Sequence, residues 1–173
     1  MWHFEAMTYR PLAFLALLAL TPSLSAHNPS PVTAEERYAL IQSWEGRWEV
    51  EEIDSLQIVF EKTAKGHTMI ERWETASGLH SMTVYHLDDD LIIATHYCPQ
   101  GNQPRLQAGS GTLGHIDFDF RDVTDLDEGE SHAHTLSFTK NSDGSLRRSE
   151  TYMSGDDLGD PTILTLVRSP EAN

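Results

Sequence analysis

The chain has 173 residues, of which 27 are acidic and 12 are basic, and its formal charge is −15 at pH 7. Because so acidic a surface repels phosphate backbones, and because no basic stripe runs along the chain, the composition argues against nucleic acids as partners. The one cysteine excludes an intramolecular disulfide, so a packed core must supply the stability. The length suits one domain with such a core.

Residues 1–25 have the pattern of a secretory signal peptide. Arg10 precedes an apolar run of about ten residues, and Ser23 and Ser25 supply the small side chains of a cleavage site. A permanent membrane helix needs roughly 20 apolar residues, so we expect no stable membrane insertion after cleavage. The sequence therefore predicts an exported protein, periplasmic or secreted. A buried N-terminal helix is the alternative.

One domain follows the predicted signal peptide. Residues 26–32 form a linker rich in Pro, Asn and Ser, the domain covers 33–169, and 170–173 form a tail. Thr33 and Glu36 have the spacing of a capping box, in which each side chain accepts a hydrogen bond from the other residue's backbone N–H. They predict one short helix at the start of the domain.

Period-two alternation of apolar and polar residues recurs through the rest of the domain. The candidate strands, separated by turn-forming residues, are 47–53, 57–63, 67–75, 79–87, 90–98, 105–109, 115–123, 132–139, 146–153 and 162–168. Short strands joined in order by tight hairpins predict an all-β fold, an up-and-down antiparallel barrel of about ten strands preceded by one short helix. A two-sheet sandwich is the alternative.

The segment Trp44-Glu45-Gly46-Arg47-Trp48, a helix that runs into G-x-W, resembles the opening of calycins, the superfamily of lipocalin-like barrels. The block 84–105 is similar to a bacterial exported branch of that superfamily. The resemblance covers roughly residues 40–168 and implies a lipocalin-like barrel, with a late arginine, here Arg168, packed over the G-x-W tryptophan. It carries no enzymatic activity over to this chain.

The central hairpin suggests which side chains point into the barrel. If Asp88-Asp89 is a two-residue turn, Tyr85 pairs with Ile92 and Ser81 pairs with His96. One face then carries mostly small and polar side chains: Thr83, Tyr85, Ile92, Ala94, His96 and Cys98. A three-residue turn would reverse the two faces. We expect this face to line the interior, where it leaves room for a ligand.

His96 and Cys98 share one face of their strand, but a nucleophile–base pair needs a third orienting group, and no motif of a cysteine hydrolase surrounds them. We therefore predict no catalytic residue. Arg105 can anchor a ligand carboxylate through its guanidinium fork, or it can pair with Glu71 or Glu150. The predicted ligand-binding residues are Glu71, Tyr85, His96, Cys98, Gln103, Arg105 and Tyr152.

Metal and cofactor signals are weak. His132 and His134 have the i, i+2 spacing that presents two imidazoles to one metal, but no third ligand is in register. The acidic stretch 117–130 lacks the D-x-D-x-D-G spacing of a calcium loop. We predict no metal and no cofactor. The alternative is haem held by one histidine in the barrel mouth, as in the nitrobindin branch of the calycins.

Together these features predict an exported barrel that binds a small hydrophobic or amphipathic molecule and is not an enzyme. One alternative is an enzyme that uses His96, Glu71, Glu150 or Arg105 at the barrel mouth. Another is a structural barrel whose interior is filled. Fold likeness alone does not decide among these functions.

Overall fold

The structure, a computed structural model, describes residues 1, 3 and 31–170. Most of the predicted signal peptide, most of the predicted linker and most of the tail lie outside these residues. The elements in chain order are α1 (Ala34–Gln42), β1 (Gly46–Val50), β2 (Leu56–Thr63), η1 (Ala64–Gly66), β3 (Thr68–Thr75), β4 (Gly78–Asp88), β5 (Leu91–Tyr97), β6 (Gln103–Ala108), β7 (His115–Thr124), β8 (Ser131–Lys140), β9 (Leu146–Ser154), β10 (Asp157–Leu158) and β11 (Thr162–Arg168). The expected helix and every expected strand are present, and β10 is additional.

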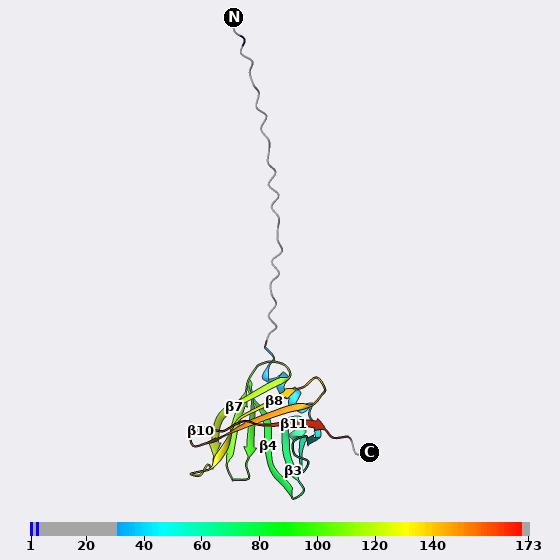
Figure 1. The fold of residues 1–173 in the computed structure, drawn as a ribbon, viewed down its shortest axis with the longest axis vertical. Helices are drawn as coiled ribbons and strands as arrows, with labels where there is room; N and C mark the ends of the chain where they lie inside the picture. The colour runs from blue at the N-terminus through cyan, green and yellow to red at the C-terminus, as the bar shows by residue number, and fades with distance from the viewer. Residues whose placement is uncertain (2, 4–30, 171–173) are drawn as a thin grey trace.

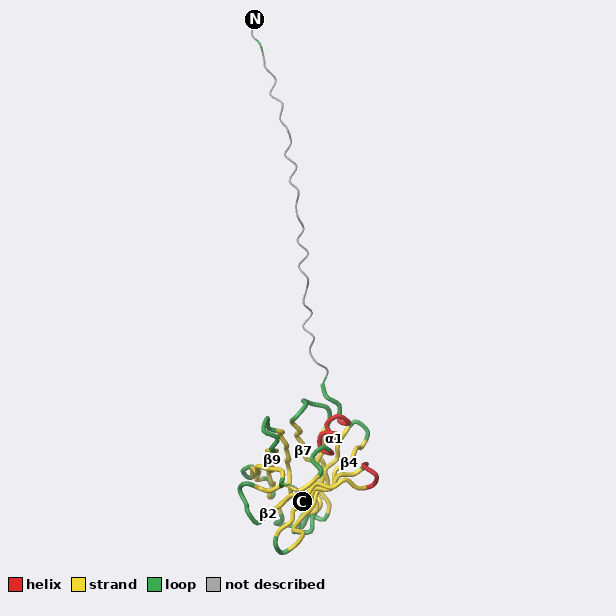
Figure 2. The backbone as a smooth tube through the Cα atoms, turned by 90° about the vertical axis from the view of Figure 1, so that its right-hand side faces the viewer, coloured by secondary structure: helices red, strands yellow, loops and turns green. Residues whose placement is uncertain are grey.

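Ten of the strands close into one antiparallel barrel, which confirms the predicted fold class (Figures 1 and 2). Each strand from β1 to β9 pairs with the next one along the chain, β11 pairs with β9, and β11 also pairs with β1 to complete the ring. The short β10 adds to β9. Because the ring is closed, the sandwich alternative is wrong.

The meander gives the barrel two different ends. The helix end carries α1, which Figure 2 shows in red at the top of the barrel. The turns at the helix end are 64–67, 89–90, 109–114 and 141–145. The turns at the opposite end, the loop end, are 51–55, 76–77, 98–102, 125–130 and 155–161.

Helix α1 begins with the predicted capping box. The Glu36 backbone N–H donates to Thr33 Oγ1 over 3.2 Å, and the Thr33 backbone N–H donates to Glu36 Oε2 over 2.9 Å. These bonds satisfy backbone donors that a helix N-terminus otherwise leaves free. The buried side chains of Tyr38 and Ile41 then pack into the core at the helix end.

Arg37 attaches the helix to the loop between β6 and β7. Its guanidinium is buried and donates to the backbone carbonyls of Gly109 and His115. Val32, at the end of the predicted linker, forms an antiparallel bridge with Gly111 in the same loop. The segment before the helix is therefore held against the barrel.

The G-x-W segment has the arrangement that the calycin resemblance implied. The Arg168 guanidinium carbon lies 4.5 Å from the centre of the Trp48 ring, and the group donates to the carbonyls of Glu45 and Ser43 over 2.8 and 3.2 Å. Gly46 has a φ of +128°, and a Cβ there would lie 2.7 Å from Arg168 Nη1. A side chain at position 46 would clash with the Arg168 guanidinium, so only glycine fits there.

The central hairpin has the expected inward face but a different register. Its turn is Asp89-Asp90 rather than Asp88-Asp89, so Thr83 pairs with His96 and Tyr85 with Ala94. The predicted pairings are wrong by two residues. Because side chains alternate with a period of two, this shift leaves the inward face unchanged.

The interior changes character from one end to the other. Large apolar side chains fill the helix end: Ile41, Trp44, Trp48, Phe60, Met69, Ile92, Phe118, Phe138, Leu146 and Leu166. The Trp44 and Phe138 rings lie 4.8 Å apart, centre to centre. Burying each such side chain stabilises the fold by about 1.5–3 kcal/mol. Polar side chains replace apolar ones nearer the loop end.

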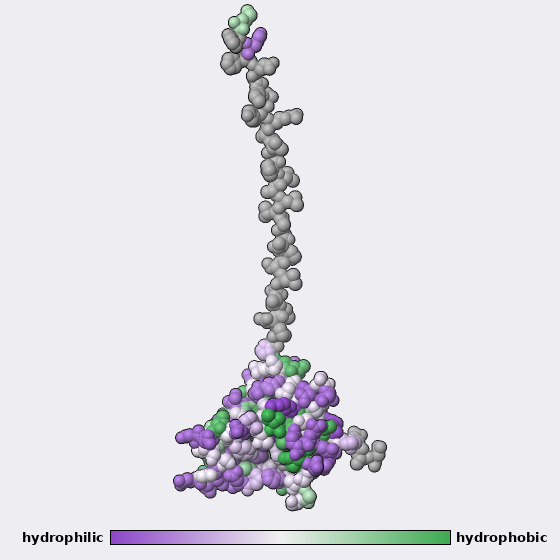
Figure 3. Space-filling model, in the orientation of Figure 1, coloured by the Kyte–Doolittle hydropathy of each residue, from purple (hydrophilic) through white to green (hydrophobic). Residues whose placement is uncertain are grey.

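The outer surface is mostly hydrophilic in the view of Figure 3, with small hydrophobic patches among charged residues. This agrees with the strongly acidic composition. Among residues 31–170, no helix has the length and apolar composition of a membrane span.

Candidate functional site

Polar and aromatic side chains gather inside the barrel between its middle and the loop end. We call this set the polar interior: Glu71, Trp73, Thr83, Tyr85, His96, Phe120, His132, His134, Arg148, Glu150 and Tyr152. They come mainly from β3, β4 and β5 on one side and from β7, β8 and β9 on the other.

Arg148 is the centre of the polar interior. Its Nε donates to Glu71 Oε1 over 2.9 Å, and its Nη1 lies 2.8 Å from Glu150 Oε2 in an ion pair without hydrogen-bond geometry. Trp73 Nε1 donates to Glu71 Oε1 over 2.8 Å, and the Tyr85 hydroxyl donates to Glu71 Oε2. The guanidinium also lies over the Trp73 ring, 4.6 Å from its centre.

Burial makes these charges interdependent. The side chains of Arg148 and Glu71 are 2% and 0% exposed. Burial alone lowers the pKa of Arg148. The nearby carboxyl groups of Glu150 and Glu71 raise the pKa by more than burial lowers it, so the net shift is upward and the guanidinium stays charged. The pKa of Tyr85 is raised by burial and by Glu71, which keeps its hydroxyl protonated as a donor. The network therefore contains one cation facing two carboxyl groups.

His96 lies beside this network. Its Nδ1 is 3.0 Å from Thr83 Oγ1, so that nitrogen is hydrogen-bonded to a hydroxyl rather than to Cys98. Burial, followed by the positive charge of Arg148, lowers the pKa of His96. The imidazole is therefore neutral at pH 7 and adds no charge to the polar interior.

His132, His134 and Phe120 form a cluster of three rings near the loop end, in which the two imidazole centres lie 5.7 Å apart. The His134 ring stacks on Phe120 with centres 4.8 Å apart, and the His132 ring lies 4.9 Å from Phe120. His132 is 8% exposed, and neither of its ring nitrogens has a hydrogen-bond partner. Nδ1 of His134 is also buried without a partner. Buried polar atoms without a hydrogen-bond partner are uncommon in proteins, because each one lowers the stability of the fold by about 1–3 kcal/mol.

The inward side chains nearest the loop end are not sealed from solvent. Trp73, Phe120, His134 and Tyr152 are each half-buried, although they pack against the core or against one another. Tyr152 has its pKa raised first by burial and then by Glu150, which leaves the hydroxyl protonated. The arrangement offers aromatic faces, hydrogen-bond donors and acceptors, and a carboxylate to a molecule that enters from the loop end.

The structure brings together four of the seven residues that the sequence predicts as ligand-binding. Glu71, Tyr85, His96 and Tyr152 all lie in the polar interior. Cys98 follows His96 at the loop end and is half-buried.

Gln103 and Arg105 lie elsewhere, on the outer face of β6. Arg105 Nε and Nη2 donate to the two carboxylate oxygens of Asp122 on β7, each over 2.6 Å. Gln103 accepts from the Thr124 hydroxyl over 2.8 Å. The alternative pairing of Arg105 with Glu71 or Glu150 is not formed, because Arg105 alternates with the buried inward residue Leu106 and so points outward.

Sequence analysis missed Arg148, the residue that organises the site. The signal is present in β9, where Leu146 is a core residue and Arg148, Glu150 and Tyr152 follow it at intervals of two. Period-two spacing places all four on one face. An arginine is seldom buried unless it is paired, and its partner Glu71 lies on β3, far away in the sequence.

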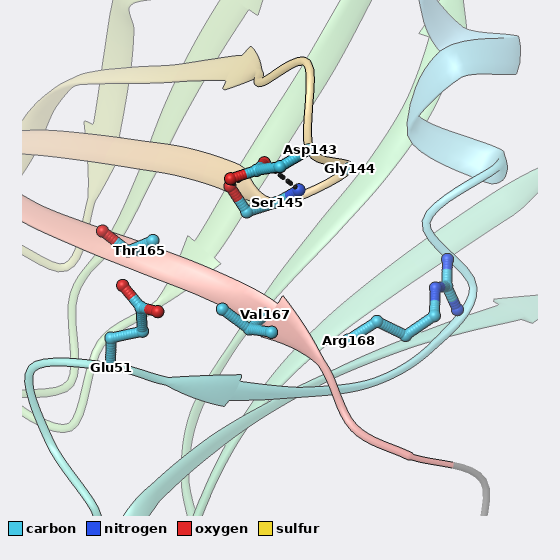
Figure 4. Close-up of a pocket in the computed structure, with 7 residues that line it drawn as sticks. All are labelled: Glu51, Asp143, Gly144, Ser145, Thr165, Val167 and Arg168. Atoms are coloured by element: carbon cyan, nitrogen blue, oxygen red, sulfur yellow. Dashed lines mark hydrogen bonds between the residues drawn. The ribbon is translucent and has the colours of Figure 1, made fainter.

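A separate hollow lies on the outside of the barrel (Figure 4). Its volume is about 570 Å³, and it is lined by Glu51, Asp143, Gly144, Ser145, Thr165, Val167 and Arg168. Asp143 accepts from the backbone N–H of Ser145 over 2.9 Å, an interaction that closes the turn between β8 and β9. None of the predicted ligand-binding residues lines this hollow.

In the part of the chain that the structure describes, no group of three or more His, Cys, Asp or Glu side chains is arranged to hold a metal ion. The comparisons with known proteins found no family model that matches the chain and no match among curated proteins. The site is therefore interpreted from its own geometry.

Proposed function

We propose that this protein is an exported, lipocalin-like barrel that binds a small, partly apolar molecule in the polar interior. The observation that carries the proposal is the division of the barrel into two halves. Apolar side chains fill the helix end, whereas half-buried aromatic and polar side chains line the interior at the loop end. A site with a few convergent polar groups among aromatic walls is typical of small-molecule recognition.

The unpartnered ring nitrogens of His132 and His134 support the same proposal. In a barrel that only had to be stable, apolar side chains at these positions would avoid the cost of burying them. A ligand that supplies hydrogen bonds at the loop end offsets that cost. Export rests on the signal-peptide pattern of residues 1–25, and the calycin relationship rests on G-x-W and the Arg168–Trp48 contact.

A titration with a neutral fluorescent probe, phenylnaphthylamine, tests the proposal. We expect saturable binding at about one probe per chain, as expected for a single interior site. Tyr152→Ala, which removes an inward aromatic side chain, should weaken binding about tenfold, the scale of one lost aromatic contact.

The matched control is Tyr97→Ala, which removes an outward tyrosine that is 43% exposed at the same end of the barrel. It should leave the probe affinity unchanged. Equal losses in both variants would mean that the probe does not enter the interior. No saturable binding of this probe, of a fluorescent fatty acid or of haem would favour a filled barrel instead.

A further inference from the structure

The loop end carries an excess of negative charge. Its turns contain ten carboxylates and no lysine, arginine or histidine. The carboxylates are those of Glu51, Glu52, Asp54, Asp125, Asp127, Glu128, Glu130, Asp156, Asp157 and Asp160. Like charges gathered around an opening raise the local concentration of cations and repel anions. Any charged molecule that reaches the polar interior from this end passes these residues.

The polar interior continues the same sign of charge. Its single cation, Arg148, already faces two carboxyl groups, those of Glu71 and Glu150. Burial and then the neighbouring His134 lower the pKa of His132, so its ring is neutral at pH 7. Arg105, the cation that the sequence suggested as an anchor for a carboxylate, is bonded to Asp122 on the outer face. The described part of the interior thus offers no unpaired cation to an anionic ligand.

Buried polar atoms at the loop end point independently to a ligand that donates hydrogen bonds. His132 is more than nine-tenths buried and has no partner at either ring nitrogen, and its neutral imidazole leaves one of these nitrogens as a free acceptor. The fully buried Asn102 donates to Glu130 and to the Ser131 carbonyl, each over 3.1 Å, while its Oδ1, which can only accept, has no partner. An ammonium group carries donors and no acceptor, whereas a carboxylate carries acceptors only.

We infer that the ligand is a cationic amphiphile, an apolar body that bears an ammonium-type group. This inference rests on the proposed function. The cation enters at the loop end and lies near Glu150, whose side chain is 10% exposed. The half-buried rings of Tyr152 and Trp73 contact the apolar body and stabilise the cation through their π faces. The same charges disfavour haem, whose propionates are anionic.

The test compares three probes that share a ten-carbon chain: decylammonium, whose protonated amine carries three N–H donors, decyl glucoside and decanoate. Calorimetric titration of the full chain should show the cation binding at least about tenfold more tightly than decanoate, the scale of one hydrogen bond or ion contact to a charged group. Added salt should weaken the cation's binding and leave the glucoside's unchanged, because salt screens charge interactions.

Glu150→Gln identifies the interior carboxylate. It should reduce the affinity for the cationic probe about tenfold and reduce the affinity for the neutral glucoside much less, because the amide that replaces the carboxylate has nearly the same size and still accepts hydrogen bonds. The control Glu49→Gln removes the same charge from an exposed position on the outer face of β1 and should have little effect.

The outcomes separate the two proposals. Binding of decanoate or the glucoside as tightly as the cation would overturn the inference and leave the proposed function standing. Saturable binding of none of the three probes would overturn both. A loss of cation affinity that is equal in Glu150→Gln and Glu49→Gln would show that only the net charge of the protein matters, which contradicts the assigned site.

Discussion

Arg148 on β9 and Glu71 on β3 meet across the inside of the barrel, with Nε and Oε1 2.9 Å apart. Both side chains are almost completely buried. The two strands are not neighbours in the ring, so this contact links opposite walls. Removing one partner of a buried ion pair leaves the other charge unpaired in an interior that solvates it poorly. The pair therefore fixes the barrel's shape around the polar interior.

Arg148→Met should lower the free energy of unfolding by about 3–5 kcal/mol, because it leaves two buried carboxyl groups without their cation. Denaturant titration followed by tryptophan fluorescence measures the loss. In the double variant Arg148→Met/Glu71→Gln, the loss should be smaller than the sum of the two single losses, since the residues act as a pair. Additive losses would contradict the coupling.

Arg105→Met is the matched control for this prediction, because it makes the same substitution in an ion pair on the outer face. Arg105 and Asp122 are 43% and 42% exposed, and solvent screens such a pair. The variant should lose much less stability than Arg148→Met and should bind phenylnaphthylamine with unchanged affinity. A loss of binding would return Arg105 to the ligand site.

Arg168→Ala should destabilise the barrel by roughly 1–2 kcal/mol, since it removes a cation–π contact and hydrogen bonds from a charged group. The contacts join the end of β11 to Trp48 and to the carbonyls of Ser43 and Glu45. Thermal unfolding measures the change. Arg168→Lys keeps the charge but not the planar fork, so it should recover only part of the stability. Full recovery would mean that charge alone accounts for the effect.

Stability should fall as the solution is acidified through the range in which histidine titrates. Burial lowers the pKa of His96 in the folded protein, so the unfolded chain takes up its proton at a higher pH, near 6.5. Between the unfolded and the folded pKa the unfolded state binds more protons, and acidification therefore favours unfolding. His132 acts in the same direction.

Denaturant titrations at about pH 7.5 and about pH 5.5 measure this effect, since that interval contains the ordinary histidine pKa and lies above those of carboxyl groups. His96→Gln should show a smaller difference between the two free energies of unfolding. Identical differences in the variant and the parent protein would remove His96 from the explanation.

The strands were predictable because the alternation of apolar and polar residues is a local property of the sequence. The run from Leu146 to Tyr152 shows what this alternation predicts and what it does not. The pattern places Arg148 and Glu150 on the face of a core leucine. It does not show that Glu71, the ion-pair partner of Arg148, lies on another strand. The sequence alone therefore favours an exposed arginine.

The register of the central hairpin was not predictable for a different reason. Three aspartates, Asp88, Asp89 and Asp90, allow two positions for a two-residue turn, and both keep the same inward face. Arg105 illustrates a third limit. Its partner Asp122 comes from a neighbouring strand whose register shifts at this point, and no local pattern reveals that shift.

Cys98 offers the most direct measurement of the central claim, that a small molecule binds inside the barrel at the loop end. It is the only cysteine, it is half-buried, and it lies at the loop end two residues after the inward His96. We predict that decylammonium slows the reaction of Cys98 with a thiol reagent, with half-protection at the concentration that half-saturates binding. In the control Cys98→Ser/Val167→Cys, the thiol lies in the outer hollow of Figure 4 and should gain no protection. An unchanged Cys98 rate at saturating probe, or equal protection of both thiols, would contradict the account.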